Sequence, residues 1–412
     1  MKCCKNSKFV DFLKGERMID VQVVEEPKRK AVRFTELSDI ADRATSYLHH
    51  VRERILAPHP RKHAPVFTLA QIAKLCGIEK SRANYILANK DEAPKGTEVG
   101  RNKKREFSLS EAQNWVKLFS KIEKKNSTAD AYVWASGNFK GGVTKTTTAL
   151  AIAQGLSLRG RKGLIIDLDP QGSMTSLFGI LPDSEVSDAE TVLPFISGEI
   201  DTLDYAIQET YWSGIDLIPA CVNLFSAEFI LPSRQASDSN YEFWDVLRKG
   251  IQPLLSKYDF IIFDTPPALS YLTINAFFAA NGLVVPMPPS PLDFASSTQF
   301  WTLFSDLTGG IAERIPSLQD REYENLNILV TLSEQSTSAS VVKDWIKDTY
   351  QDHVLKVEIP KAEGAKAAAA AFGTAYEVNQ NNATFNRVRE AYDSLAETID
   401  NQMLAFWQKE TV

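Results

Sequence analysis

The stretch "WASGNFKGGVTKTTTALAIAQGL", residues 134–156, decides the fold that this sequence predicts. A short apolar segment enters a loop that holds two glycines and two lysines, and a run of helix-forming residues follows. A loop placed between a strand and a helix in this way binds phosphate, because backbone N–H groups and the helix N-terminus face the anion. The spacing departs from the common pattern G-x-x-x-x-G-K-[ST], since Phe139 and Thr144 stand where that pattern has glycine.

Each polar residue of the loop has a predicted role. The Lys145 ammonium can reach the β and γ phosphates of a nucleotide, and the Thr146 hydroxyl can bind Mg²⁺. The extra lysine, Lys140, comes too early in the loop for this task, and its long side chain could cross to a nucleotide held by another subunit. The residues expected to surround the phosphates are Gly141, Gly142, Val143, Thr144, Lys145 and Thr146.

Two apolar stretches that end in carboxylates follow the loop. They are "KGLIIDLD", residues 162–169, and "YDFIIFDTPP", residues 258–267. With "GLVVPMPP" and "NILVTLS" they predict central strands of a mostly parallel α/β sheet, because such strands are buried on both faces. Ligands bind at the carboxyl ends of these strands. Asp167 and Asp264 are therefore the predicted partners of the metal through water, and Asp169 should lie beside them.

Length and composition exclude several classes of protein. A chain of 412 residues is too long for one ordinary core, so two or three domains are expected. No apolar run reaches the roughly 18 to 20 residues that cross a bilayer, and the first residues lack a secretory apolar core. The four cysteines form no C-x-x-C pair, which argues against a zinc site. A cytoplasmic protein without a membrane partner is expected.

Charge is distributed unevenly along the chain. Residues 1–130 hold 27 Lys and Arg against 17 Asp and Glu, and the remaining residues hold 19 against 35. A basic arm joined to an acidic body suggests that the arm binds nucleic acid. A charged, solvated surface without a ligand is the alternative interpretation.

Residues 66–89 have the pattern of two helices joined by a tight turn. Thr68 can cap the first helix, Gly77 can form the turn, and the second helix is suited to the major groove of DNA. The basic segment that follows resembles a β-wing, so a winged helix-turn-helix is predicted. The alternative is a small helical core with a basic rim. The residues predicted to contact DNA are Lys80, Ser81, Arg82, Asn84, Arg101, Lys103, Lys104 and Arg105.

Three segments of the chain are expected. Residues 1–60 contain an amphipathic helix, 35–55, which packs on its own domain or pairs with a second copy. Residues 61–126 form the winged helix-turn-helix, and residues 127–412 form the nucleotide-binding body.

The loop resembles the deviant Walker A sequence, K-G-G-x-x-K-[ST], of the ParA/MinD ATPases. The whole chain is similar to the large plasmid-type ParA partition proteins, including the stretch "VPMPPSPLDFASSTQF". The resemblance implies that Lys140 contacts phosphates held by the partner in an ATP-sandwich dimer, that Thr147 lies by the α-phosphate, and that Asp169 orients the attacking water. The chain departs from many relatives at Thr144, where they have glycine, because a β-branched residue restricts the backbone.

The resemblance also implies a function. ATP, Mg²⁺ and dimerisation produce a form that binds DNA nonspecifically, and a ParB-type protein stimulates hydrolysis to ADP, which is slow without it. The N-terminal domain represses its own operon, and the protein associates with the nucleoid. The lysines considered for nonspecific DNA binding are Lys343, Lys347, Lys356, Lys361 and Lys366.

Three alternatives are weaker on sequence grounds. A MinD-like membrane regulator needs a basic amphipathic C-terminus, whereas "SLAETIDNQMLAFWQKETV" begins acidic and holds a single lysine. A redox ATPase needs cluster cysteines, and only Cys221 lies in the body. A transcriptional repressor that merely senses nucleotide needs no carboxylate to position water, so Asp169 disfavours it.

Overall fold

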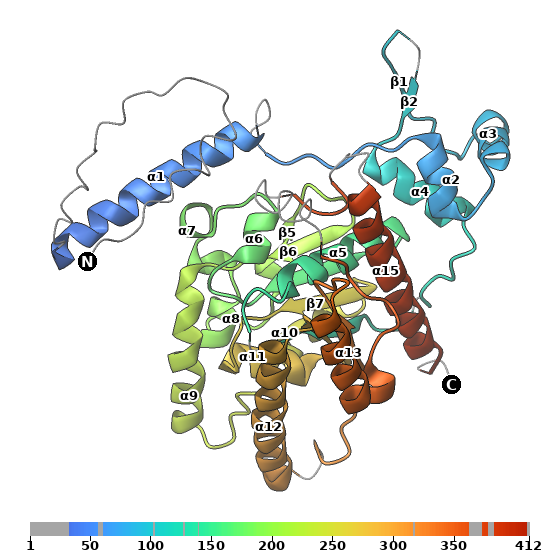
Figure 1. The fold of residues 1–412 in the computed structure, drawn as a ribbon. Helices are drawn as coiled ribbons and strands as arrows, with labels where there is room; N and C mark the ends of the chain where they lie inside the picture. The colour runs from blue at the N-terminus through green and yellow to red at the C-terminus, as the bar shows by residue number, and fades with distance from the viewer. Residues whose placement is uncertain are drawn as a thin grey trace, which may run out of the picture. The chain divides into compact units, whose positions relative to one another are not determined.

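The computed structural model describes most of the chain (Figure 1). The described ranges are 33–56, 61–101, 104–126, 128–138, 140–315, 318–361, 373–377 and 383–409. The chain separates into two units, Met1–Ala57 and Pro58–Val412. The predicted limits of 61–126 and 127–412 remain predictions, since both ranges belong to the second unit.

In the first unit, the described residues 33–56 form α1 (Leu37–Leu56) after a 3₁₀ turn at Phe34–Glu36. The helix predicted over 35–55 is therefore confirmed. Its apolar side chains are not covered within the unit: no side chain described between residues 33 and 53 is buried, and Ile40 and Leu48 are 42% and 41% exposed.

The second unit begins with the predicted helix-turn-helix and hairpin. Its elements are α2 (Leu69–Cys76), α3 (Lys80–Asn89), β1 (Thr97–Val99), β2 (Lys104–Glu106) and α4 (Leu109–Phe119). Thr68 caps α2, because its hydroxyl accepts from the backbone N–H of Gln71 while the Gln71 side chain accepts from the N–H of Thr68. Gly77 ends α2 with a φ of +64°, a conformation that glycine adopts without strain.

A seven-stranded sheet forms the centre of the body, in the order β5-β6-β4-β7-β3-β8-β9. The strands are β3 (Tyr132–Ser136), β4 (Gly163–Asp167), β5 (Gln208–Glu209), β6 (Ile215–Ile218), β7 (Phe260–Asp264), β8 (Gly282–Met287) and β9 (Asn325–Val330). All pairs are parallel except β5 with β6, so the predicted mostly parallel sheet is confirmed. Strands β5 and β6 were not predicted from the sequence.

Helices cover both faces of the sheet (Figure 1). They are α5 (Lys145–Leu158), α6 (Ser173–Leu177), α7 (Pro182–Glu185), α8 (Leu193–Ser197), α9 (Ala227–Ser237), α10 (Val246–Ile251), α11 (Tyr271–Ala279), α12 (Pro291–Arg314), α13 (Thr337–Tyr350) and α15 (Ala383–Lys409). Short 3₁₀ turns lie at Asp188–Glu190, Asp204–Ala206, Val222–Ser226, Gln252–Leu254 and Gln351–His353. Alternate strand residues face α5 and α15 on one side and α8 to α12 on the other. None of the described helices is long and apolar enough to cross a bilayer.

The region of α2 to α4 shares its core with the body. Buried residues of that region, Trp115 among them, form one apolar cluster with residues of α5 and α15. The Gln113 side chain donates a hydrogen bond of 2.6 Å to the carbonyl of Ser213. Lys62 donates to the carbonyl of Leu177 at 2.7 Å and pairs with Glu377 at 2.8 Å. The predicted DNA-binding region is therefore packed directly on the predicted ATPase body.

Candidate phosphate-binding site

The loop after β3 has the backbone of a tight anion-binding turn. Gly142 has a φ of +77° and Thr144, directly before α5, has a φ of +74°. The left-handed region costs an L-residue with a Cβ roughly 1–2 kcal/mol, so the threonine at 144 is strained. A Cβ added at Gly141 would meet no atom within 4 Å, so the chain itself does not explain the glycine there. Close approach of a phosphate to the backbone does explain it.

The start of the loop is tied to the neighbouring strand. The Asn138 side chain accepts a hydrogen bond from the N–H of Lys140 at 3.0 Å and donates to the carbonyl of Pro286, in β8, at 2.8 Å. The Lys145 ammonium donates to the carbonyl of Lys140 at 3.0 Å. These bonds hold the loop over the end of the sheet, where the sequence predicted it.

Strand register brings the predicted carboxylates together. Asp264 is the partner of Asp167 in β4 and of Ser136 in β3. Asp167 and Asp264 are fully buried, and Lys145 is 7% exposed. Parallel strands that end at one level therefore place two carboxylates beside the helix that carries Lys145.

The Asp167 carboxylate is fixed by hydrogen bonds. It accepts from the N–H and the hydroxyl of Thr175, at 2.9 and 2.7 Å, and from the N–H of Asp169 at 3.2 Å. Burial raises its pKa, and the two bonds from Thr175 act in the opposite direction. Thr175, which lies in "DPQGSMT" after the two aspartates, was not predicted from the sequence.

Asp264 is the unusual residue of the site. Among the described residues, no group makes a hydrogen bond of normal length to either of its buried carboxylate oxygens, although the Thr146 hydroxyl is close enough to affect its pKa. Burial raises its pKa well above the ordinary range and the charge of Asp167 adds to this, whereas the Thr146 hydroxyl and Lys145 act in the opposite direction. A buried carboxylate without hydrogen bonds is expensive unless a cation or its water shell provides partners.

The site has more acceptors than cations. Burial lowers the pKa of Lys145, although Asp264 and Asp169 oppose this shift. Asp169 is 8% exposed and accepts a hydrogen bond from the N–H of Gln171 at 2.9 Å. In the described part of the chain no three His, Cys, Asp or Glu side chains form a metal-binding group. The donor set fits Mg²⁺, which keeps several waters and takes one or two carboxylates together with phosphate oxygens.

Lys140 has a partner in its own chain. Its ammonium lies 2.7 Å from Oδ1 of Asp293 at the start of α12. Asp293 lies in the stretch "VPMPPSPLDFASSTQF", whose residues had no predicted chemical role. In the structure, Asp293 is the ion-pair partner of Lys140, the first lysine of the loop.

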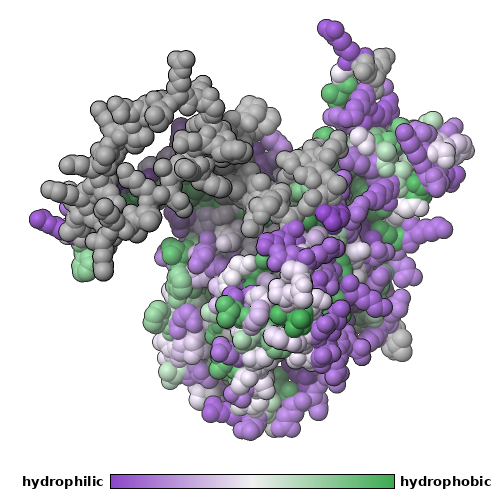
Figure 2. Space-filling model, viewed as in Figure 1, coloured by the Kyte–Doolittle hydropathy of each residue, from purple (hydrophilic) through white to green (hydrophobic). Residues whose placement is uncertain are grey.

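The residues predicted to contact DNA lie apart from the loop, on α3 and the hairpin. Lys80, Ser81, Arg82 and Asn84 are exposed on α3. Arg101 is also exposed, and Lys103 lies outside the described residues. The face shown in Figure 2 is mostly hydrophilic around these elements.

Two residues of the hairpin differ in their freedom to reach a ligand. The Lys104 side chain is 63% exposed and lies 3.5 Å from Glu106. Arg105 instead spans the hairpin, with bonds of 2.7 Å to Glu98 and 3.0 Å to the carbonyl of Lys95. Arg105 therefore stabilises the wing, and Lys104 is the better candidate for a phosphate contact.

The lysines considered for nonspecific DNA binding are partly neutralised. Lys343 pairs with Glu358 at 2.6 Å, and Lys361 pairs with Glu334 at 2.9 Å. Lys366 lies outside the described residues. This surface is therefore less basic than its sequence suggests.

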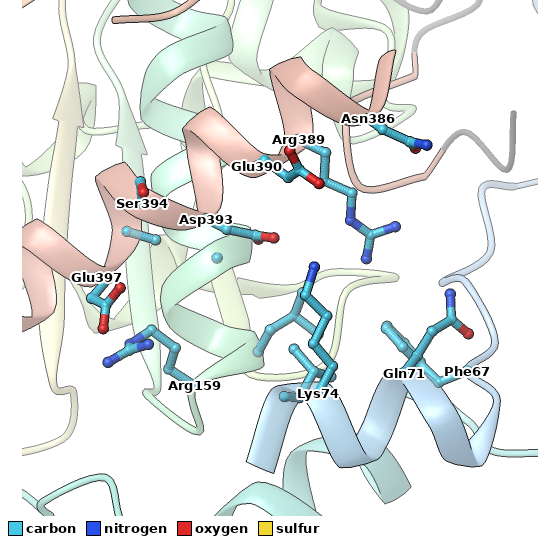
Figure 3. A pocket seen from close by; sticks show the side chains of 14 residues that line it. Phe67, Gln71, Lys74, Arg159, Asn386, Arg389, Glu390, Asp393, Ser394 and Glu397 are labelled. Carbon is cyan, nitrogen blue, oxygen red and sulfur yellow. The ribbon is translucent and has the colours of Figure 1, made fainter. Parts of the chain in front are cut away.

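A cavity of about 550 Å³ lies where α2, α5 and α15 meet (Figure 3). Lys74 of α2 points toward Arg389 and Asp393 of α15, and Arg159 at the end of α5 lies nearby. Burial raises the pKa of Asp393, while a hydrogen bond from Tyr376 and the charges of Arg389 and Lys74 act in the opposite direction. The lining comes from the end of α5 that is remote from the phosphate loop, so this cavity is not the nucleotide site.

Comparison with known proteins agrees with this geometry. A family model described as an AAA domain matches residues 132–315, which include the loop and both strand-end carboxylates. A putative replication protein A from Sinorhizobium fredii is 28% identical over 366 residues, covering 86% of this chain and 89% of the relative. Protein SopA from Escherichia coli is 30% identical over 257 residues, covering 60% and 63%. The chain belongs to the ParA/MinD family of P-loop ATPases.

A further relative and two solved structures extend the match. Plasmid partition protein A from Escherichia coli is 26% identical and covers 84% of this chain and 90% of its own. A solved structure described as a partition protein shares the fold over 90% of this chain and 98% of its own, with a TM-score of 0.63 and 18% identity. Cobyrinic acid a,c-diamide synthase from Mycobacterium smegmatis, solved with an ATP analogue and magnesium, has a TM-score of 0.52 and 27% identity, covering 65% and 94%.

Proposed function

We propose that this protein is a DNA partition ATPase that binds ATP with Mg²⁺, dimerises, binds DNA nonspecifically and hydrolyses ATP when a ParB-type partner stimulates it. One observation carries the proposal. In the strand register, Asp167 and Asp264, whose carboxylate lacks a hydrogen-bond partner among the described residues, lie at the carboxyl ends of β4 and β7, and Lys145 begins α5 there. Its similarity to a plasmid partition protein supports a role in DNA partition.

The loop residues have distinct roles in nucleotide binding. The backbone of Gly141 to Thr147 surrounds the phosphates, and the Lys145 ammonium neutralises the β and γ groups once it leaves the carbonyl of Lys140. Thr146, Asp167 and Asp264 would hold Mg²⁺, the two aspartates through water. When bound, the ion would supply the positive charge that the carboxylates and the phosphates need.

Hydrolysis requires a water positioned beside the γ-phosphate. Asp169 is the residue for this role, because it is nearly buried at the same strand ends and one of its oxygens is already oriented by the N–H of Gln171. A carboxylate held in this way accepts a hydrogen bond from water without moving. Slow turnover in the isolated protein and stimulation by the partner follow from a site that is completed only on dimerisation.

Dimerisation and DNA binding use other parts of the chain. Lys140 serves the phosphates of the second subunit, and the uncovered apolar side of α1 pairs with its copy. The exposed face of α3 enters the major groove of an operator, and Lys104 in the wing contacts phosphate. The protein thus represses its own operon and associates with the nucleoid in the cytoplasm.

A nucleotide-sensing repressor without a role in segregation is the second candidate. The observation that favours it is the core shared by α4, α5 and α15, together with the cavity of Figure 3. A nucleotide at the start of α5 could act on DNA affinity through this contact. Both candidates share the site, and they differ in whether the chain turns over ATP in response to a partner.

The decisive experiment measures ATP turnover of the full chain alone, with nonspecific DNA, and with DNA plus the ParB-type protein encoded beside it. We expect little turnover alone and the greatest rate with DNA and partner together. The Lys145→Ala variant is the control and should remain at the background rate. If nucleotide binds normally but turnover is not stimulated in any combination, the nucleotide-sensing repressor would be the only candidate function that remains.

A further inference from the structure

The ion pair between Lys140 and Asp293 joins two segments that lie far apart in the sequence. The Lys140 ammonium is 2.7 Å from Oδ1 of Asp293, and their side chains are 38% and 10% exposed. The lysine can therefore reach solvent, whereas the aspartate is nearly enclosed. A pair of this kind holds the cation in one position as long as nothing competes for it.

The start of α12 fixes the Asp293 carboxylate. Ser290 caps the helix, with Pro291 in its first turn, and its hydroxyl accepts a hydrogen bond from the N–H of Asp293 at 3.3 Å. The same hydroxyl donates to Oδ2 of Asp293. One carboxylate oxygen is thus used by the serine, and the other faces Lys140.

The backbone of Lys140 is fixed independently of this pair. Its N–H donates to the Asn138 side chain, and its carbonyl accepts from the Lys145 ammonium. Only the side chain of Lys140 has to move for the ammonium to leave Asp293. Opening the pair therefore costs the interaction itself and does not require the loop to refold.

We propose that Asp293 holds Lys140 within its own subunit and thereby opposes ATP-dependent dimerisation. The inference rests on the proposed function, in which Lys140 serves the phosphates of a second subunit. While the ammonium is on Asp293 it is not available to a second subunit. Each sandwich dimer must open two such pairs, so the threshold concentration for association is set partly by Asp293.

The expected change in the dissociation constant follows from the solvent exposure of the Lys140–Asp293 pair. An ion pair that touches solvent shifts an equilibrium by up to about fivefold. Because a dimer opens two pairs, release of both lowers the dissociation constant by up to about 25-fold. Asp293→Asn removes the charge and keeps the shape, so the hydroxyl of Ser290 can still donate to it.

The test compares full-length variants in a hydrolysis-deficient Asp169→Ala background by sedimentation equilibrium. The dissociation constant with ATP is measured against the same protein with ADP, which removes any contribution from association through α1. Asp293→Asn should have a lower dissociation constant than the parent protein. Asp293→Glu retains the charge, so its dissociation constant should equal that of the parent. Glu334→Gln makes the same change of charge and breaks the Lys361–Glu334 pair, which involves neither Lys140 nor Asp293. Its dissociation constant should therefore also equal that of the parent.

The double variant shows whether the effect passes through Lys140. Adding Asp293→Asn to Lys140→Ala should not tighten association, since there is no ammonium to release. Equal tightening with and without Lys140 would overturn the proposal, as would an unchanged or weaker constant for a folded Asp293→Asn protein. Ser290→Ala is the second variant if that protein melts early, and it should give a smaller change in the same direction; no change would again overturn the proposal. A parent that does not associate with ATP at all would refute the proposed function itself, and the inference with it.

Discussion

Replacing Asp264 with asparagine should stabilise the protein without its ligands. Both oxygens of Asp264 are buried and have no hydrogen bond among the described residues, and the pKa of the carboxyl is raised well above its ordinary value of 3.8. An amide has nearly the same shape but carries no charge. The substitution therefore removes the penalty of the charged form and leaves the packing of β7 intact.

The structure sets an upper limit on this gain. The folded protein can always avoid the charge by keeping a proton on Asp264. At pH 7 this costs about 4 kcal/mol, from 1.36 kcal/mol for each unit between 3.8 and 7. Because the pKa is raised on folding, the native state binds more protons than the unfolded state, and wild-type stability falls as the pH rises above about 4. Asparagine does not titrate, so the stability of the variant lacks this dependence on pH. The difference in unfolding free energy between Asp264→Asn and the wild type should therefore grow by up to about 2.7 kcal/mol between pH 5 and pH 7.

Thermal unfolding in EDTA without nucleotide, at several pH values from 5 to 8, measures the effect. We expect the melting temperature of Asp264→Asn to exceed that of the wild type by an amount that increases with pH. The same variant should lose Mg²⁺-dependent ATP affinity, which separates a stabilised fold from a functional site. Lower stability at every pH, or a difference that does not change with pH, would refute the reasoning.

Four further substitutions test the phosphate loop and the predicted DNA-binding elements. Lys145→Ala should abolish nucleotide binding in calorimetry, because it removes the main cation facing the β and γ phosphates; wild-type affinity would contradict the assignment. Arg82→Ala should weaken operator binding and relax its sequence preference, and Lys104→Ala should reduce the slope of log affinity against log salt by about one. Unchanged binding in both would argue against DNA recognition by α3 and the wing. Thr144→Gly should raise the unfolding free energy by up to about 1 kcal/mol, the left-handed strain less the entropy of glycine; lower stability in thermal melts would show that the contact of 3.3 Å between the Thr144 and Thr148 hydroxyls offsets the strain.

Local signals in the sequence predicted the elements that hold the site. The strands that became β3, β4 and β7 are continuous apolar runs, because both faces of a central parallel strand are buried. The cap at Thr68 and the turn at Gly77 are chemical requirements of single positions, and the structure confirms both. Predictions of this kind succeed because each depends on residues that are near one another in the chain.

The missed elements depend on long-range packing. Strand β5 is two residues long and polar, and β6 has four residues, with Asp216 among them, so neither has a strong pattern of its own. The pairing of Lys140 with Asp293 joins the first loop to α12, and no spacing rule connects them. Thr175 follows Asp167 in the chain, but its bond to the carboxylate requires that α6 turn back over the strand end. Such contacts follow from topology, which the sequence pattern specifies only in outline.

The candidate phosphate-binding site combines three local costs that a purely structural site would avoid. The buried Asp264 carboxylate has no hydrogen bond of normal length from any described residue, Lys145 is buried among carboxylates, and Thr144 is left-handed. The first two are electrostatic and have opposite signs, so a magnesium–nucleotide complex would relieve both, with its cation beside the aspartate and its phosphates beside the lysine. The third is steric and remains when ligand is bound. The charges of this site are therefore arranged for a ligand that carries both signs, which a bare phosphate or a bare metal ion does not. Neither component alone should bind as tightly as the two together.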